Sequence, residues 1–218
     1  MSKTSDMLQL AELLASRLCH DFAGPLGALV GILDVAREEH RQSETVALAE
    51  QTAGEMAKRL KLLRAAWGYA SEELDVAALH DHAVVLTGSR GIDLDLSGLA
   101  PSAVFSPPIA RLVLNILLLA VESLSGKGKI ALSGSPDAEL LITIAGPRAA
   151  WPEGFAACLA NPAVAAAAIA KAGPRELQAP LTALLVQAHG WRLAMLIPAG
   201  PSGDEDTAPP LLLASNHR

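Results

Sequence analysis

The sequence has little of what marks secreted, membrane-spanning or metal-binding proteins. Its 218 residues contain two cysteines, Cys19 and Cys158, whose spacing matches no metal-ligand pattern. The N-terminal segment carries Glu12 and Arg17 among its apolar residues, which a signal peptide would not. The longest apolar stretch, residues 109–121, is too short to span a bilayer. We therefore expect a cytoplasmic protein with free thiols, no bound metal and no membrane partner.

Charge is scarce as well. Only 18% of the residues are charged, the formal net charge is -6, and the isoelectric point is about 5.5. Proteins that bind nucleic acid usually present a basic surface, so no nucleic-acid partner is expected. In contrast, 51% of the residues are hydrophobic, which indicates extra buried surface such as a subunit interface. The length allows one large domain or two modest ones.

Two long helices are predicted in the first 70 residues. Apolar residues recur at steps of three and four between residues 5 and 39, which predicts an amphipathic helix roughly 50 Å long. A second apolar stripe runs to about Trp67, with Ser43 as a candidate N-cap. The connection around residues 40–42 is short, which favours an antiparallel hairpin. Because two helices alone cannot bury both apolar faces, we predict a dimer.

The rest of the chain mixes strands with helices. Helices are predicted at 75–86, 106–124, 161–172 and 176–188, and strands at 92–96, 129–133, 139–145 and 191–197. This order favours an α+β layer of helices on one sheet. The expected division is a helical hairpin at 1–70, an α+β domain at 71–198, and a flexible tail at 199–218, which is rich in Gly, Pro, Ser and Asp.

The first helix contains three glycines on one face. Gly24, Gly27 and Gly31 follow His20 at +4, +7 and +11, so they share its side of the helix. Each costs about 1 kcal/mol relative to alanine inside a helix. They indicate either that another surface approaches His20 or that helices pack closely along this face. Pro25 removes one backbone N–H from the same helix, which predicts a kink one turn past His20.

Residues 20–26 read His-Asp-Phe-Ala-Gly-Pro-Leu. A histidine followed by an acid, with a proline five residues on and a leucine six on, resembles the phosphoacceptor box of two-component histidine kinases. The chain looks most like the ChpT-type histidine phosphotransferases of alphaproteobacteria. The resemblance implies an α+β fold with a long antiparallel helical hairpin, paired into a four-helix bundle in the dimer. A degenerate histidine-kinase ATPase-like α/β sandwich would follow the hairpin.

This resemblance implies roles for the residues around the box. His20 would be the phosphoacceptor, since a neutral imidazole nitrogen is a good nucleophile and its pKa leaves much of it neutral near pH 7. Asp21 would orient the imidazole or accept its proton. Arg17 would offset the charge of the phosphoryl group, and Gly24, Pro25 and Gly27 would let the partner approach. Alternatively, an acid and an arginine on an exposed helix face are only solvated.

The sequence departs from the kinases at the ATP site. Kinases carry two asparagines four apart on one helix, whereas here Asn115 is followed by Leu119, which cannot ligate a metal. After the strand at 141–144, where kinases have Asp-x-Gly, residues 145–148 read Ala-Gly-Pro-Arg. The glycine-rich lid is reduced to Gly173-Pro174. An ATP site needs a metal ligand, a base reader and a phosphate cradle, so we expect no cofactor and no autokinase activity.

The resemblance thus implies a histidine phosphotransferase in a multistep phosphorelay. The receiver domain of a hybrid histidine kinase would donate a phosphoryl group from its aspartate to His20, and the receiver domain of a response regulator would accept it. Mg²⁺ would come with the receiver's acidic pocket. Three alternatives stay open: an active histidine kinase with an unusual ATP site, a non-catalytic dimeric adaptor that binds response regulators, and a phosphatase of receiver domains. ATP binding would favour the kinase, and a His20→Ala variant that leaves signalling intact would favour the adaptor.

Overall fold

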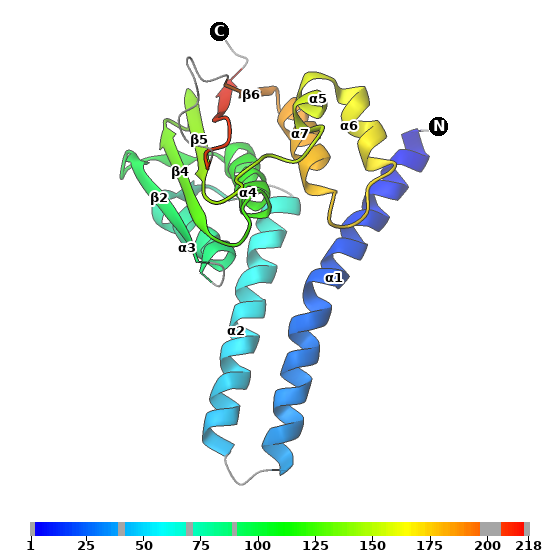
Figure 1. The fold of residues 1–218 in the computed structure, drawn as a ribbon, viewed down its shortest axis with the longest axis vertical. Helices are drawn as coiled ribbons and strands as arrows, with labels where there is room; N and C mark the ends of the chain where they lie inside the picture. Colours follow the sequence, from blue (N-terminus) through cyan, green and yellow to red (C-terminus); the bar gives the residue numbers. More distant parts are fainter. Residues whose placement is uncertain (1–2, 39–41, 69–71, 89–90, 197–205, 216–218) are drawn as a thin grey trace.

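The computed structural model describes residues 3–38, 42–68, 72–88, 91–196 and 206–215 (Figure 1). Its first part is an antiparallel pair of long helices, α1 (Lys3–Glu38) and α2 (Gln42–Trp67). α1 runs through Pro25 without ending. Glu44 in the first turn and Arg64 in the last turn of α2 interact favourably with the helix dipole. The predicted helical hairpin is therefore confirmed; of the predicted connection, residues 39–41 lie outside the described residues.

The second part is a sheet with helices packed on it. The five-stranded sheet has the order β2-β4-β5-β7-β6, in which β2 and β4 are parallel and the other neighbours antiparallel. Its strands are β2 (Ile92–Leu99), β4 (Gly128–Gly134), β5 (Glu139–Ala145), β6 (Trp191–Met195) and β7 (Leu211–Ser215). The helices are α3 (Val76–Thr87), α4 (Pro107–Glu122), α5 (Phe155–Ala160), α6 (Pro162–Ile169) and α7 (Gln178–Ala188). β1 (Leu74–Asp75) and β3 (Val104–Phe105) form a small separate pair.

The local sequence explains the central elements of this domain. α4 begins with Pro107 in its first turn, where the missing N–H costs nothing, and residues 112–121 are all buried. β4 and β5 pair as the predicted hairpin. Alternate residues such as Ile130, Ile142 and Ile144 are buried, because one face of the sheet lies under the helices. The predicted α+β arrangement is confirmed.

The expectation of a flexible tail after residue 198 is wrong for Leu211–Ser215. These residues form β7, which lies inside the sheet between β5 and β6. Leu211 and Leu213 are fully buried. Three consecutive leucines supply the apolar face that an internal strand needs, and this signal outweighs the Gly- and Pro-rich sequence before it. Residues 197–205 and 216–218 lie outside the described residues.

The upper half of the hairpin is built into the second domain (Figure 1). Leu10, Leu13 and Leu14 of α1 pack against an apolar cluster formed by the α6 and α7 region. Leu18 and Phe22 pack against the main core. From α2, the main core takes in Leu62, Leu63 and Ala66. The two domains therefore share one core, rather than being joined only through a linker.

The lower half of the hairpin leaves apolar side chains exposed. They include Leu26, Val30 and Leu33 of α1 and Val46 and Leu48 of α2, each at least 42% exposed. Within α1, the stretch Met7–Ala36 contains an 18-residue window with a mean hydropathy of 1.3, and it is long and apolar enough to cross a membrane by length and composition. In this fold the same helix instead holds ion pairs and packs against α2 and the second domain.

Candidate functional site

His20 lies on α1 at the point where the hairpin meets the second domain. Its side chain is 48% exposed and borders a cavity of about 410 Å³. Three arginines line this cavity: Arg17 from α1, Arg59 from α2 and Arg175 from the loop before α7. Two acids, Asp21 and Glu122, line it as well. The histidine is thus open to solvent yet surrounded by charged side chains from four parts of the chain.

The two ring nitrogens of His20 face opposite kinds of partner. Nδ1 lies 3.4 Å from Oδ1 of Asp21, and Nε2 lies 3.2 Å from Nη2 of Arg175. A carboxylate only accepts hydrogen bonds and a guanidinium only donates them. Both contacts therefore require the same neutral tautomer, with the proton on Nδ1 and a lone pair on Nε2. This arrangement leaves the free lone pair of the ring on Nε2.

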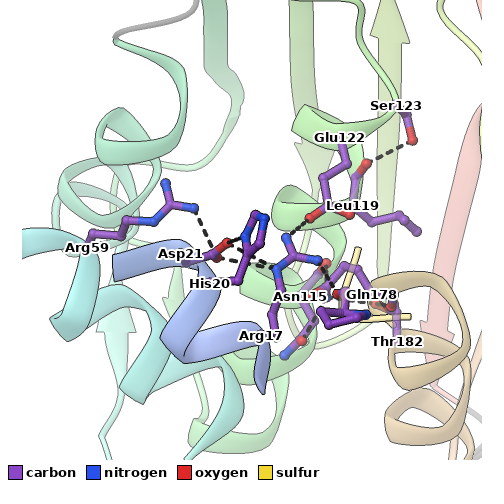
Figure 2. Close-up of polar contacts among 11 residues, drawn as sticks. Arg17, His20, Asp21, Arg59, Asn115, Leu119, Glu122, Ser123, Gln178 and Thr182 are labelled. Carbon is purple, nitrogen blue, oxygen red and sulfur yellow. Dashed lines mark hydrogen bonds and ion pairs between the residues drawn. The ribbon is translucent and has the colours of Figure 1, made fainter. Parts of the chain in front are cut away.

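Asp21 is held by two arginines as well as by His20 (Figure 2). Arg17 Nε and Arg59 Nη2 lie 3.3 and 3.1 Å from its carboxylate. Partial burial raises the pKa of Asp21, but the charge of Arg17 and the hydrogen bond from Arg59 outweigh this effect and lower its pKa below the usual range. Asp21 is therefore ionised near neutral pH, and its negative charge stabilises any positive charge that develops on the ring.

Arg17 has partners that the sequence did not indicate. Its side chain is only 9% exposed. It donates to Glu122 of α4, to the carbonyl of Pro174 at 2.8 Å, and to Asp21. Burial lowers the pKa of Arg17, but the two carboxylates outweigh it and raise the pKa above its usual value. The guanidinium thus ties α1 to α4 and to the loop before α7, whereas the sequence suggested a charge on an exposed face.

The glycine face beside His20 is open within a single chain. A Cβ placed on Gly24, Gly27 or Gly31 would meet no atom within 4 Å. Close packing of helices inside one chain therefore does not account for these glycines. Pro25 lies in the same part of α1, half-buried. The open face remains available to a second polypeptide.

Three of the charged residues at the cavity, Arg59, Glu122 and Arg175, were missed at the level of sequence. Arg59 stands on the second helix without a motif around it. Arg175 lies 155 residues from His20 along the chain. The only available signal was the helical periodicity of α2, which would place Arg59 on the side of α2 that faces α1. No local pattern marks Arg175.

The positions expected to have lost ATP-site function lie deep in the fold. Leu119 is fully buried in the core. The amide of Asn115, also fully buried, donates to the carbonyls of Ala66 at 2.6 Å and Arg111 at 2.9 Å. Nε2 of Gln178 donates to Oδ1 of Asn115 at 3.0 Å (Figure 2). Both side-chain donors and the acceptor of Asn115 are thus used to join α4 to the end of α2 and to α7.

The segment after β5 is closed in a similar way. β5 ends at Ala145, and a Cβ placed on Gly146 would lie 2.6 Å from the carbonyl oxygen of Lys127. The backbone there is pressed against the chain that precedes β4. Residues 145–148 contain no acid that could read an adenine.

An exposed histidine on a helical hairpin, followed by an α/β domain of this kind, defines the class of phosphotransfer proteins of two-component signalling. The profile described as "Histidine phosphotransferase C-terminal domain" matches residues 85–200. The chain belongs to this family of transferases.

Three individual proteins illustrate what the chain is similar to. The protein phosphotransferase ChpT of Brucella abortus (strain 2308) is 29% identical over 150 residues, which are 66% of this chain and 70% of the relative. The structure of a bacterial phosphotransferase superposes with a TM-score of 0.68 at 21% identity, covering 98% of this chain and 96% of that one. The histidine kinase domain of a blue-light-activated kinase from Erythrobacter litoralis gives a TM-score of 0.42 at 14% identity, covering 88% and 93%.

Proposed function

We propose that this phosphotransferase is an intermediate of a multistep phosphorelay and carries the phosphoryl group on Nε2 of His20. It accepts this group from the aspartyl phosphate of one receiver domain and passes it to the aspartate of a second. The observation that carries the proposal is the pair of contacts that leaves the lone pair on Nε2, next to a cavity open to a partner. Asp21 fixes the tautomer and the orientation of the ring.

We further propose that the protein does this without ATP. Asn115 cannot serve a nucleotide while its amide is committed to Ala66, Arg111 and Gln178, and Leu119 offers no metal ligand. Among the described residues, no three His, Cys, Asp or Glu side chains are grouped so that they could hold a metal ion. We assign the Mg²⁺ of the reaction to the acidic pocket of the receiver domain.

The protein acts as a homodimer in this proposal. The apolar side chains on the lower half of the hairpin, Leu26, Val30 and Val46 among them, are about half exposed in one chain. Pairing with a second hairpin into a four-helix bundle would cover them. The glycine face beside His20 would then lie at the groove where a receiver domain docks, and the second domain would contribute the other wall. We place the protein in the cytoplasm, where receiver domains are found.

The experiment is transfer from labelled, phosphorylated receiver domains to the full chain, with an ATP-only control and a His20→Ala variant. Label that reaches the wild type from a receiver, but not from ATP, and is absent from the variant supports the proposal. Label taken directly from ATP would show that the protein is a kinase. Receiver binding that leaves no label on the wild type would favour the adaptor function. Loss of the receiver's label as free phosphate would instead indicate a phosphatase.

A further inference from the structure

The loop between α6 and α7 brings a cation from the second domain onto the reactive nitrogen. Arg175 is exposed, and its Nη2 lies 3.2 Å from Nε2 of His20. The loop is held in place on both sides of this residue. Arg17 donates to the carbonyl of Pro174 at 2.8 Å, and Leu177 is almost fully buried in the small apolar cluster. The position of Arg175 is therefore set by the fold rather than by its own side chain alone.

The charges at the cavity favour an anion. Three arginines face two carboxylates there. Arg17 is engaged by Asp21 and Glu122, and Arg59 is engaged by Asp21. Arg175 instead directs its guanidinium at a neutral ring nitrogen. A phosphoryl group bonded to this nitrogen would bring three oxygens into the reach of the guanidinium, which matches phosphate geometry with two parallel N–H donors.

We propose that Arg175 is a catalytic residue that binds the phosphoryl group during its transfer to and from His20. In the first step the lone pair of Nε2 attacks the phosphorus of the donor's aspartyl phosphate. A P–N bond forms, the P–O bond to the aspartate breaks, and the electron pair leaves with the aspartate carboxylate. Nδ1 keeps its proton, and the carboxylate of Asp21 stabilises the positive charge of the ring. Arg175 moves from Nε2 to the phosphoryl oxygens, so the ring nitrogen is freed as the group arrives.

The second domain thus supplies part of the reaction chemistry, in addition to any role in holding partners. In a kinase the loop before this helix would belong to the nucleotide site. Here the same region serves the phosphoryl group after it has reached histidine. The inference rests on the proposed function of His20 as the phosphoryl carrier.

The test uses phosphoramidate, a small donor that removes the need for a docked receiver. Its P–N bond breaks as the bond to Nε2 forms, and ammonia leaves. We expect Arg175→Ala to slow labelling of His20 in the full-length protein by about 10- to 100-fold, below the loss seen for donors in dry oxyanion holes because this site is open to water. Arg175→Lys keeps the charge but not the two-donor geometry and should be intermediate. The matched control is Arg192→Ala, which removes an exposed arginine of β6.

A rate for Arg175→Ala equal to that of the wild type would overturn the proposal, and so would an equal loss in the Arg192→Ala control. A second measurement is the half-life of the phosphohistidine once it is formed, since a residue that binds the phosphoryl group changes this half-life, whereas a docking residue does not. Failure of every receiver to label His20 would contradict the proposed relay function. The phosphoramidate rates would still decide the role of Arg175.

Discussion

Replacing Arg17 with methionine tests whether the second domain is held on the hairpin by ion pairs. Methionine keeps most of the apolar stem and removes the guanidinium. The change takes one hydrogen-bond donor each from Glu122, the Pro174 carbonyl and Asp21. Asp21 retains Arg59 at 3.1 Å, so its carboxylate keeps a cation. Glu122 loses the ion pair that joins α4 to α1.

The size of the effect follows from burial. Removing one partner of a fully buried ion pair costs about 3–5 kcal/mol, whereas exposed pairs contribute about 0–1 kcal/mol. The Arg17 side chain is 9% exposed and that of Glu122 is 25% exposed. This places the pair nearer the buried limit, and Arg59 offsets part of the loss at Asp21. We expect the free energy of unfolding to fall by about 2–3 kcal/mol and the melting temperature by about 4–12 °C for a chain of this size.

The measurement is urea unfolding followed by tryptophan fluorescence, with Arg192→Met as the control for loss of an exposed arginine. A double-mutant cycle with Glu122→Gln should give a coupling of about 1–2 kcal/mol, because the two side chains share one contact. A loss below about 0.5 kcal/mol, with no coupling to Glu122, would refute the argument. The same variant should also slow transfer through His20, since the loop that carries Arg175 loses its bond from Arg17.

Three further predictions concern the network, the helix face and pH. Asn115→Ala should lower the free energy of unfolding by about 2–4 kcal/mol, because buried groups of Ala66 and Gln178 lose their partner; urea unfolding that shows less than 1 kcal/mol would contradict this. Gly27→Ala should stabilise a single chain by about 0.5–1 kcal/mol, yet slow transfer from a phosphorylated receiver domain, because the added methyl group would enter the proposed docking groove; an unchanged transfer rate would place the docking groove elsewhere. The pKa of Asp21 is lowered in the folded state, so its contribution to stability is present above the usual carboxyl pKa and is lost as the pH falls through the folded value. The stability difference between wild type and Asp21→Asn should therefore be constant near neutral pH and shrink in acid, and a difference that grows in acid would show that the sign is wrong.

Sequence patterns were sufficient for the elements that depend on local periodicity. The two long helices, the apolar α4 after Ser106 and the β4–β5 hairpin each follow from side-chain spacing and end signals within one segment. β7 was missed because a five-residue strand derives its stability from neighbours distant in sequence. The short α5 was missed for a related reason, since six residues are too few to show a helical period.

At the candidate site, sequence identified the residues on α1 and missed those that reach it from elsewhere. His20 and Asp21 could be recognised because they are adjacent and lie in a known motif. Arg17 was recognised, but its burial against Glu122 depends on how α1 packs on α4. Arg175 reaches His20 only through the packing of the α6–α7 region on α1. Such a contact has no signature in either local segment.

The place of β7 in the sheet has a consequence for the order of assembly. α1 and α2 leave the ribosome long before Leu211–Ser215 is synthesised, and yet β7 separates β5 from β6. The five-stranded sheet therefore cannot be completed until β7 has been synthesised, whereas both helices of the hairpin have been made by then. Domains fold as they emerge, N-terminal parts first, so in the homodimer that we propose two nascent hairpins can meet before either sheet is complete. β7 is then the last strand to enter the sheet, after the helices of the proposed dimer interface have been made.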